Sequence, residues 1–194
     1  MSDDTRERIL EATETLLRRH GPDKVAVVDV ARALGMSHAN VYRFFDSKVA
    51  LKNAIVARWL ARVTAPLDAI VAAEGPAGAR LRQWIVTLMA EKRRKVLDDP
   101  EMFTAFQRLV ADARPALTGH MDHLTAQVRA LIEAGRASGE FRVADIEAAT
   151  AMVLDATVRF HHPRLVAEAA GQDLDARAEA VIQVVLAGLA GGVL

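Results

Sequence analysis

The stretch LGMSHANVYRFFDSK, residues 34–48, gathers hydrogen-bonding and charged side chains beside three aromatic rings. His38 and Asn40 can donate and accept hydrogen bonds at the edges of bases, and Arg43 can form paired hydrogen bonds with a guanine or a phosphate. Small Ala39 would let a helix backbone approach the bases, and its methyl group can contact a thymine methyl. These residue types at helical spacing indicate a helix that lies in a DNA groove.

A second group of side chains is suited to the phosphate backbone. The hydroxyl of Tyr42 can reach a phosphate oxygen while its ring packs against the protein. Lys48 stands near the start of the next expected helix, where it adds charge to free N–H groups that favour a phosphate. Thr5 and Arg6 can fasten the first helix to the same backbone. We therefore expect base contacts and phosphate contacts from one short region.

Two short helices joined by a tight turn would position these groups. The apolar spacing predicts a helix over about 28–34 and another after Ser37, whose hydroxyl can cap it. Gly35 can adopt the positive φ that the turn between them needs. Val41 and Phe45, four residues apart, share the inward face. This is the pattern of a helix-turn-helix.

Apolar residues recur at spacings of three and four almost throughout, alanine is frequent and β-branched runs are short, so the chain is predicted to be all-α. Further helices are expected over about 4–20, from 48 to 66, over 77–97, from 100, from 115, over 145–170 and over 174–189. Gly21-Pro22 should end the first helix, and Pro66 should kink or end the fourth. We expect a three-helix DNA-binding domain over residues 1–50 and a larger helical effector-binding and dimerisation domain over 51–194.

Charge and composition narrow the class of protein. The 194 residues carry 25 Lys+Arg and 25 Asp+Glu, which argues mildly against a DNA-binding protein. Between residues 31 and 62, however, six bases accompany a single acid, Asp46. The absence of cysteine excludes disulfides and thiolate chemistry. The acidic N-terminus has no signal-peptide pattern and the longest apolar stretch, 181–194, is too short for a bilayer, so we expect a cytoplasmic protein without a membrane partner.

The segment VARALGMSHANVYRFFDSKVAL, residues 30–51, resembles the DNA-binding domain of the TetR family of one-component repressors. The matching residues are Ala31, Gly35, Ser37, Tyr42, Phe45, Ser47, Lys48 and Leu51. The resemblance covers about residues 5–60, and the rest matches only in length and helical content. It implies about nine helices, a homodimer, a palindromic DNA operator and a pocket for a small-molecule effector. The DNA-binding candidates are Thr5, Arg6, Ser37, His38, Ala39, Asn40, Tyr42, Arg43 and Lys48.

The sequence departs from the family pattern at two positions. The family commonly has a threonine at the start of the second helix, where it caps the helix and touches phosphate, whereas this chain has Val27. An acid often follows the lysine, whereas here Val49 does. Both departures predict altered phosphate anchoring.

Flexible methionines beside aromatic rings can line an adaptable apolar pocket, although each could equally be ordinary core. The pocket candidates are Trp84, Met89, Met102, Phe103, Phe106, His120, Met121, Asp155 and Phe160. Asp155 and Arg159, four apart, are expected to form an ion pair. The fourth helix is expected to link the pocket and the DNA-binding domain, with Trp59 and Val63 meeting the helix that carries Trp84 and Leu88.

The last two long helices are expected to form a dimer interface. Both are apolar on more than one face, and a helix apolar nearly all round must be covered on both sides. The interface candidates are Leu154, Val158, Val181, Val184, Val185, Ala187 and Gly188.

The favoured function is a repressor released from its operator by a small, largely apolar effector. A constitutive DNA-binding dimer without an effector is one alternative. The other is a helical enzyme in which His120 and either Glu91 or Asp155 act as acid and base, but no nucleophile elbow, phosphate loop or metal-ligand spacing supports it. His120, His123, His161 and His162 invite a metal site, yet no carboxylate obviously converges on them. We therefore expect neither catalysis, nor a metal, nor a cofactor.

Overall fold

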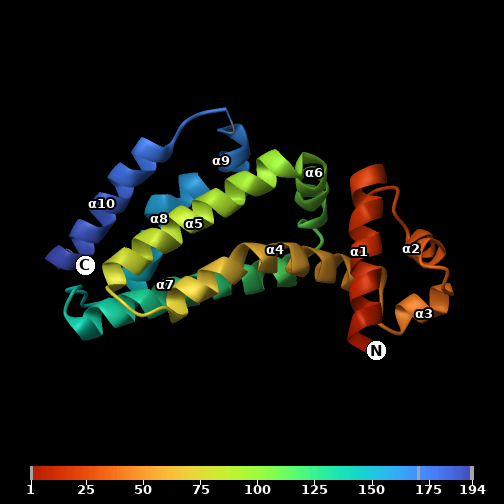
Figure 1. The fold of residues 1–194 in the computed structure, drawn as a ribbon, viewed down its shortest axis with the longest axis horizontal. Coiled ribbons are helices and arrows are strands. Elements are labelled where there is room, and N and C mark those ends of the chain that lie inside the picture. The colour runs from red at the N-terminus through yellow and green to blue at the C-terminus, as the bar shows by residue number, and fades with distance from the viewer. Residues whose placement is uncertain (1, 170, 193–194) are drawn as a thin grey trace. The chain divides into compact units, whose positions relative to one another are not determined.

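The computed structural model describes residues 2–169 and 171–192. Its helices are α1 (Ser2–His20), α2 (Val27–Ala33), α3 (His38–Tyr42), α4 (Lys48–Ala72), α5 (Ala77–Asp98), α6 (Pro100–Leu109), α7 (Arg114–Ser138), α8 (Ile146–His161), α9 (Pro163–Glu168) and α10 (Asp175–Gly191), as labelled in Figure 1. No strand occurs among the described residues, so the predicted all-α class is confirmed. None of the helices within that part of the chain is both long and apolar enough to cross a membrane.

The chain folds into two compact units. The first unit contains the residues up to Ala61 together with Asp99–His120. It therefore combines α1, α2, α3 and the start of α4 with α6 and the first turns of α7. The second unit contains Arg62–Asp98 and the residues from Met121 onward. A segment from the middle of the chain thus belongs with the N-terminal helices.

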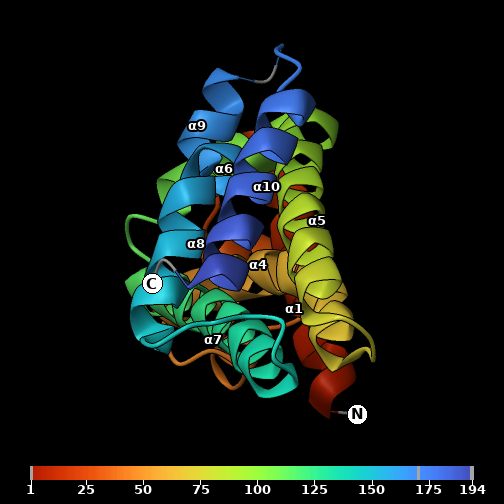
Figure 2. The ribbon, with the colours of Figure 1, turned by 90° about the vertical axis from the view of Figure 1, so that its left-hand side faces the viewer.

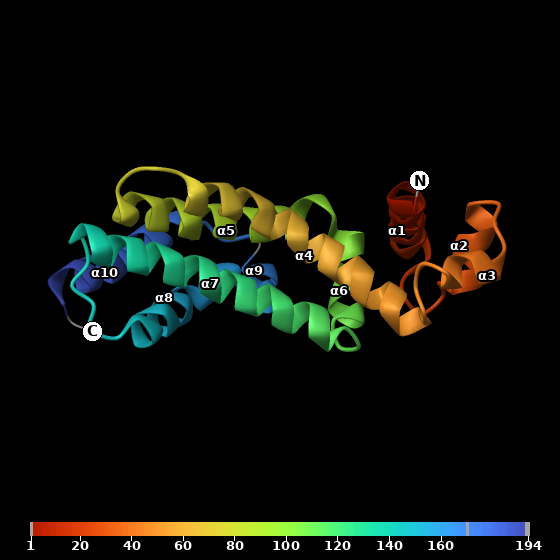
Figure 3. The ribbon, with the colours of Figure 1, turned by 90° about the horizontal axis from the view of Figure 1, so that it is seen from below.

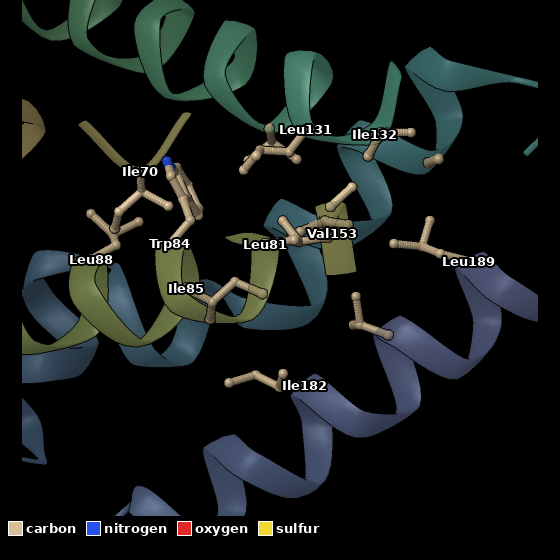
Figure 4. Packing of buried hydrophobic residues seen from close by; sticks show 14 of the residues in the cluster. Ile70, Leu81, Trp84, Ile85, Leu88, Leu131, Ile132, Val153, Ile182 and Leu189 are labelled. Atoms are coloured by element: carbon tan, nitrogen blue, oxygen red, sulfur yellow. The ribbon is translucent and has the colours of Figure 1, made fainter. Parts of the chain in front are cut away.

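Helix α5 supplies the centre of the core of the second unit. Its inward side chains Leu81, Trp84, Ile85 and Leu88 follow the predicted spacing and are at most 2% exposed. Figure 4 draws them with side chains from helices α4, α7, α8 and α10, namely Ile70, Leu131, Ile132, Val153, Ile182 and Leu189. Helices α8 and α10 pack against each other and against α5 (Figure 2). Val63 belongs to the same core as Trp84, as expected, whereas Trp59 belongs to the first unit and packs on Phe106 of α6 instead.

Aromatic stacking and ion pairs hold the first unit together. The Trp59 ring of α4 stacks on Phe106 of α6 with centroids 4.0 Å apart, and Phe103 lies 6.4 Å from the same ring. Within the same unit, α2 and α3 lie side by side (Figure 3). Arg18 of α1 makes a two-nitrogen contact with Asp99, whose carboxylate also caps α6. The α6 segment is therefore fastened to α4 by aromatic contacts and to α1 by an ionic contact.

Proline acts differently from the expectation at two places. Pro66 was expected to kink or end the fourth helix, and it does not end it, because α4 continues through Pro66 to Ala72. Leu67 and Ile70, beyond the proline, are buried, and this packing outweighs the missing backbone hydrogen bond. The helix expected over 145–170 is instead split, because His162 is extended (φ −69°, ψ 124°) before Pro163 starts α9. The end of that expected helix, residue 170, lies outside the described residues. The ten helical segments among the described residues agree with the nine or so implied.

The start of α5 is capped by a distant residue that the sequence did not reveal. The Glu140 carboxylate accepts hydrogen bonds from the backbone N–H groups of Ala77 (2.8 Å) and Gly78 (2.9 Å). These N–H donors lower the pKa of Glu140. Next to it, Phe141 packs on Gly135 so closely that a Cβ there would lie 2.1 Å from the ring. This corner therefore depends on contacts between α5 and the segment after α7.

Candidate functional site

The turn between α2 and α3 has the geometry that its glycine predicts. Gly35 has φ +61°, and the Met36 N–H donates to the Ala31 carbonyl at 3.0 Å. A left-handed glycine with this bond closes the end of a helix in a Schellman motif. The turn thereby redirects the chain immediately before α3.

A side-chain cap and two buried side chains set α3 in place. The Ser37 hydroxyl accepts a hydrogen bond from the Asn40 N–H at 3.2 Å, as predicted for a capping serine. Val41 and Phe45 are buried, at 1% and 4% exposure. The opposite side of the helix, which carries Ala39, is left exposed.

The groups predicted to contact bases surround that exposed side. His38 and Arg43 are exposed, Asn40 and Tyr42 are half-buried, and the His38 and Tyr42 rings meet edge to face at 4.8 Å. The Tyr42 ring is thus partly packed while the helix presents small Ala39 to solvent. A helix with this surface can approach the floor of a groove and donate or accept hydrogen bonds there.

The phosphate candidates begin two neighbouring helices. Lys48 is the first residue of α4 and is exposed, and the preceding Ser47 hydroxyl accepts from the Ala50 N–H at 3.0 Å. On α1, the Arg6 guanidinium lies 5.0 Å from the centre of the Phe45 ring. Thr5, one residue earlier, is half-buried. Thr5, Arg6 and Lys48 therefore lie in the same unit as α3.

The start of α2 corrects one detail of the family comparison. The N-cap position is occupied by Ala26, and Val27 is the first helical residue and is buried. The capping role assigned to position 27 therefore belongs to position 26, where alanine has no side-chain acceptor. Asp29 compensates in part, because its carboxylate accepts from the Ala26 N–H at 3.0 Å.

Much of the basic patch counted in the sequence is neutralised inside the first unit. Arg58 contacts Glu7 at 2.7 Å and Glu14 at 3.3 Å, and Lys52 contacts Asp112 at 2.8 Å. Arg32 pairs with Asp29 as well. By contrast, Arg43 and Lys48 have no ion-pair partner among the described residues. The available positive charge is therefore concentrated beside α3.

The pocket candidates are divided between the two units and do not form one group. Met102, Phe103, Phe106 and His120 belong to the first unit, where all are buried. Trp84, Met89, Met121, Asp155 and Phe160 belong to the second. There Met121 is 43% exposed, whereas Met89 and Phe160 line one small pocket.

A buried tryptophan begins a hydrogen-bond chain that the sequence did not reveal. The Trp84 indole N–H donates to the Gln127 side-chain oxygen at 3.0 Å, and the Gln127 amide donates to Asp68 at 2.7 Å. His123 Nε2 lies 2.7 Å from the same Asp68 oxygen. Asp68 is therefore a carboxylate that converges on a histidine, contrary to the expectation that none does. The described residues contain no group of three metal-ligating side chains.

The acids named for the enzyme alternative have other surroundings. Glu91 pairs with Arg94 one turn along α5. Asp155 is exposed, and the ion pair expected between it and Arg159 does not occur among the described residues.

Two basic side chains of the second unit are buried. His161 is 8% exposed, and burial lowers its pKa to about 4. A hydrogen bond to the Leu154 carbonyl opposes this shift, whereas the charges of Lys92 and His162 add to it. Burial also lowers the pKa of Lys92 to about 8.

The interface candidates lie on α8 and α10 of the second unit. Val158 and Val184 are 39% and 73% exposed, large fractions for apolar side chains. Val181, Val184 and Gly188 line a shallow apolar hollow between these helices. Leu154 and Val181 are half-buried and Ala187 is exposed. Val185 lines the same hollow, although it is 2% exposed and also belongs to the core of its own unit.

Both parts of the chain match bacterial regulator families. Residues 9–55 match the profile of the bacterial regulatory proteins of the tetR family, and residues 77–182 match the tetracyclin repressor-like C-terminal domain. The first match contains α3, and the second contains α5 through α9.

Two curated relatives come from mycobacteria. An uncharacterized HTH-type transcriptional regulator of Mycobacterium tuberculosis is 31% identical over 128 residues, which are 66% of this chain and 59% of that protein. The HTH-type transcriptional repressor KstR of Mycolicibacterium smegmatis is 30% identical over 135 residues, which are 70% of this chain and 64% of KstR. The chain thus spans less than two thirds of the length of either relative.

Solved structures share the fold at lower identity. A TetR transcription regulator from Haloarcula marismortui has a TM-score of 0.66 and 22% identity, covering 94% of this chain and 98% of its own. The regulator FadR of Bacillus subtilis, solved with stearoyl-CoA, has a TM-score of 0.59 and 15% identity, covering 96% and 98%. With the profile matches and the helix-turn-helix geometry, these likenesses agree on one conclusion: the chain belongs to the TetR family of transcriptional regulators.

Proposed function

We propose that the chain is a dimeric repressor that binds a palindromic DNA operator through α3 and releases it when a small, largely apolar effector binds. The observation that carries the DNA-binding part is the surface of α3. It combines the small exposed Ala39 with Arg43 and Lys48, which have no ion-pair partner among the described residues. A duplex would supply both the groove and the phosphates that such a surface lacks.

The proposed contacts fall into two kinds. His38, Asn40 and Arg43 would read base edges, while Lys48, Tyr42 and the start of α1 would hold phosphates. Base contacts specify the sequence, whereas phosphate contacts add affinity that falls with salt. The ionic and stacking contacts of the first unit would keep these groups in a fixed relation to one another.

Dimerisation through α8 and α10 would complete the site. Val184 and Val158 expose apolar area beside a hollow lined by small residues, and a second copy could cover that area. A two-fold axis there would separate two α3 helices by roughly 34 Å, one turn of DNA.

Relatives support the repressor and effector parts of the proposal. The M. smegmatis relative is named a repressor, and the B. subtilis structure holds stearoyl-CoA. Met89, which is half-buried at one small pocket of the second unit, is the candidate that an apolar effector would contact.

A constitutive DNA-binding dimer remains the alternative, and a specific observation favours it. Phe103 and Phe106 pack on Trp59 and are at most 7% exposed, so these candidates fill core. In a protein without an effector, Phe103 and Phe106 would have only this packing role. Operator affinity that no small molecule changes would support this alternative.

Selection from random duplex DNA tests the central proposal. We expect the unaltered chain to enrich one palindromic sequence whose half-sites lie about one helical turn apart. The double variant Arg43→Ala/Lys48→Ala should enrich nothing above background. Enrichment of sequences without two-fold symmetry, or equal enrichment by the variant, would contradict the proposal.

Sedimentation tests the dimer directly. Val184→Glu places a charge on the apolar stripe and should convert the protein to monomers, because two carboxylates would face each other across the axis. Gln183→Glu adds the same charge at an adjacent exposed position off the stripe, and should leave the dimer intact. A stable monomer of the unaltered chain would exclude the proposed interface.

A further inference from the structure

Three carboxylates of α1 face a single arginine of α4 within the first unit. They belong to Glu7, Glu11 and Glu14, whose spacing of four and then three residues places them along one face of the helix. Arg58 approaches each of them with a different nitrogen: Nη1 lies 2.7 Å from Glu7, Nη2 lies 3.6 Å from Glu11 and Nε lies 3.3 Å from Glu14. Nη1 also donates to the backbone carbonyl of Glu7 at 3.4 Å. One side chain thus contacts α1 over two turns.

This contact is largely shielded from water at its inner end. The side chains of Arg58 and Glu14 are only 15% and 4% exposed. Arg18, one turn further along α1, approaches the same Glu14 carboxylate at 3.8 Å. Separating charges that are shielded to this extent would leave each of them desolvated without its partner, which is costly. We therefore expect the contact to hold α1 against α4 in solution.

The α4 end of the contact is itself fixed. Arg58 is followed by Trp59, which is 2% exposed and whose ring stacks on Phe106 of α6 with centroids 4.0 Å apart. The backbone from which Arg58 extends therefore belongs to the packed core of the first unit. Because carboxylates surround the guanidinium, Arg58 is not available to a phosphate, although it belongs to the basic patch between residues 31 and 62. Any influence of Arg58 on DNA binding therefore passes through α1.

The start of α1 carries the group through which Arg58 would act. Arg6 directly precedes Glu7 and is exposed, and its guanidinium lies 5.0 Å from the centre of the Phe45 ring. An α-helix turns by about 100° per residue, so a rotation of α1 by one residue would carry Arg6 away from Phe45. The neighbouring contact between Glu7 and Arg58 restrains that rotation.

We propose that Arg58 is a positioning residue for DNA binding: it fixes the rotation of α1 and thereby holds Arg6 where it contacts a phosphate of the duplex. The inference deepens the proposed function by naming the residue that orients α1, and it rests on that function for the phosphate contact. The three carboxylates of α1 are then the template that sets the angle of the helix.

The variant Arg58→Lys tests the fork while keeping the net charge of the protein. Lysine has one nitrogen in place of three, so it cannot reproduce separate contacts with three carboxylates over two turns. We expect the slope of log operator affinity against log salt to flatten by about 1, because one phosphate contact is lost. At 0.1 M salt the affinity should fall about five- to tenfold. An unchanged slope would overturn the proposal.

A combination with Arg6→Ala shows whether Arg58 acts through Arg6. Arg6→Ala alone should flatten the slope by the same amount, about 1. Adding Arg58→Lys should then cause no further flattening, because the contact that it disturbs is already absent. A purely structural role for Arg58 would lower the melting temperature without this dependence on Arg6. Additive losses of slope, or a parental slope in Arg6→Ala, would contradict the proposal.

Two alanine variants of α1 give a matched comparison that leaves Arg58 in place. Glu7→Ala and Glu11→Ala each remove one exposed carboxylate from the same face of the helix, so a general effect of charge on DNA binding should be alike in both. The Glu7 contact is the shorter, 2.7 Å against 3.6 Å, so only Glu7→Ala should flatten the salt slope. Equal slopes for the two variants would show that the carboxylates act by charge alone and would refute the positioning role.

Hydrogen exchange without DNA separates this inference from the proposed function. The backbone amides of residues 6–12 should exchange faster in Arg58→Lys than in the parent, whereas those of α3 should not change, because Ser37 and Val41 hold that helix. Faster exchange together with a parent that binds no operator would contradict the proposed function while upholding the restraint on α1. Unchanged exchange at the start of α1 would overturn the inference even where the parent binds its operator.

Discussion

Two pairs of basic side chains, one pair in each unit, lie in opposite surroundings. Around α3, Arg43 and Lys48 are exposed, whereas in the second unit Lys92 and His161 are 6% and 8% exposed. An exposed charge keeps its hydration and acts through salt-dependent attraction to a polyanion. A buried charge loses hydration, so its protonation is coupled to folding. The comparison teaches that salt concentration should control the DNA affinity of the first unit, whereas pH should control the stability of the second.

The largest expected effect concerns His161. Its folded pKa of about 4 lies below the ordinary 6.5, so the unfolded chain binds more protons between these values. The contribution of neutral His161 to the free energy of unfolding is complete above about pH 6.5. It is lost as the pH falls to about 4, and the total loss is about 3 kcal/mol. Urea unfolding across this range should show a weaker acid dependence in His161→Gln. The exposed neighbour variant His162→Gln should keep the parent's dependence, and a loss in both variants would weaken the comparison.

Lys92 should make stability depend on pH in a separate, alkaline range. Burial lowers its pKa from 10.5 to about 8, so the unfolded chain again binds more protons between these values and stability should rise with pH there. Lys92→Met should lose that alkaline rise, because the methionine side chain does not titrate. Thermal unfolding of both proteins at pH 7 and pH 10 measures the rise. An equal rise in the variant would mean that another group causes it.

Arg43→Ala should weaken operator binding by about 1–3 kcal/mol and relax base preference, because a bidentate base contact discriminates by that amount. Competition between the selected operator and single-base variants of it measures the preference. The folding midpoint should not change, since Arg43 is exposed and unpaired among the described residues. An affinity loss that is the same for every DNA sequence would reassign Arg43 to a phosphate.

The smallest effect is expected at Lys48. Lys48→Ala should weaken all DNA sequences alike and reduce the slope of log affinity against log salt by about 1. Lys52→Ala is the matched control, because Lys52 already pairs with Asp112 at 2.8 Å. Titrations at several salt concentrations should therefore separate the two lysines, and equal slopes for both variants would show that the paired charge also reaches DNA.

Local patterns allowed the helix-turn-helix to be predicted. The turn needs only the positive φ of Gly35, the cap needs only Ser37, and the inward face needs only Val41 and Phe45 four residues apart. All of these relations lie within eleven residues, from 35 to 45, so neighbouring side chains and backbone decide them. The capping position before α2 was misassigned by one residue, within the usual uncertainty of helix ends.

Contacts between distant residues could not be predicted in the same way. Glu140 caps α5 from 62 residues away, and Gln127 accepts from Trp84 across 43 residues. The expected Asp155–Arg159 pair fits helical spacing, but the Arg159 guanidinium borders a pocket whose other walls come from α5 and α9. Spacing along one helix shows which side chains can meet, whereas neighbouring helices decide which do. The same reason explains why the pocket candidates divided between two units.

The two tryptophans of the chain lie one in each unit, Trp59 stacked on Phe106 and Trp84 hydrogen-bonded to Gln127. Each unit therefore carries its own fluorophore, and both indoles are almost fully shielded from water, at 2% and 0% exposure. Emission from the native protein should be blue-shifted, and each unit should shift to the red when it opens. Trp59→Phe and Trp84→Phe would give single-emitter proteins in which the melting of one unit is seen without the other. Comparing the two variants would show whether the two units lose their structure together or in sequence.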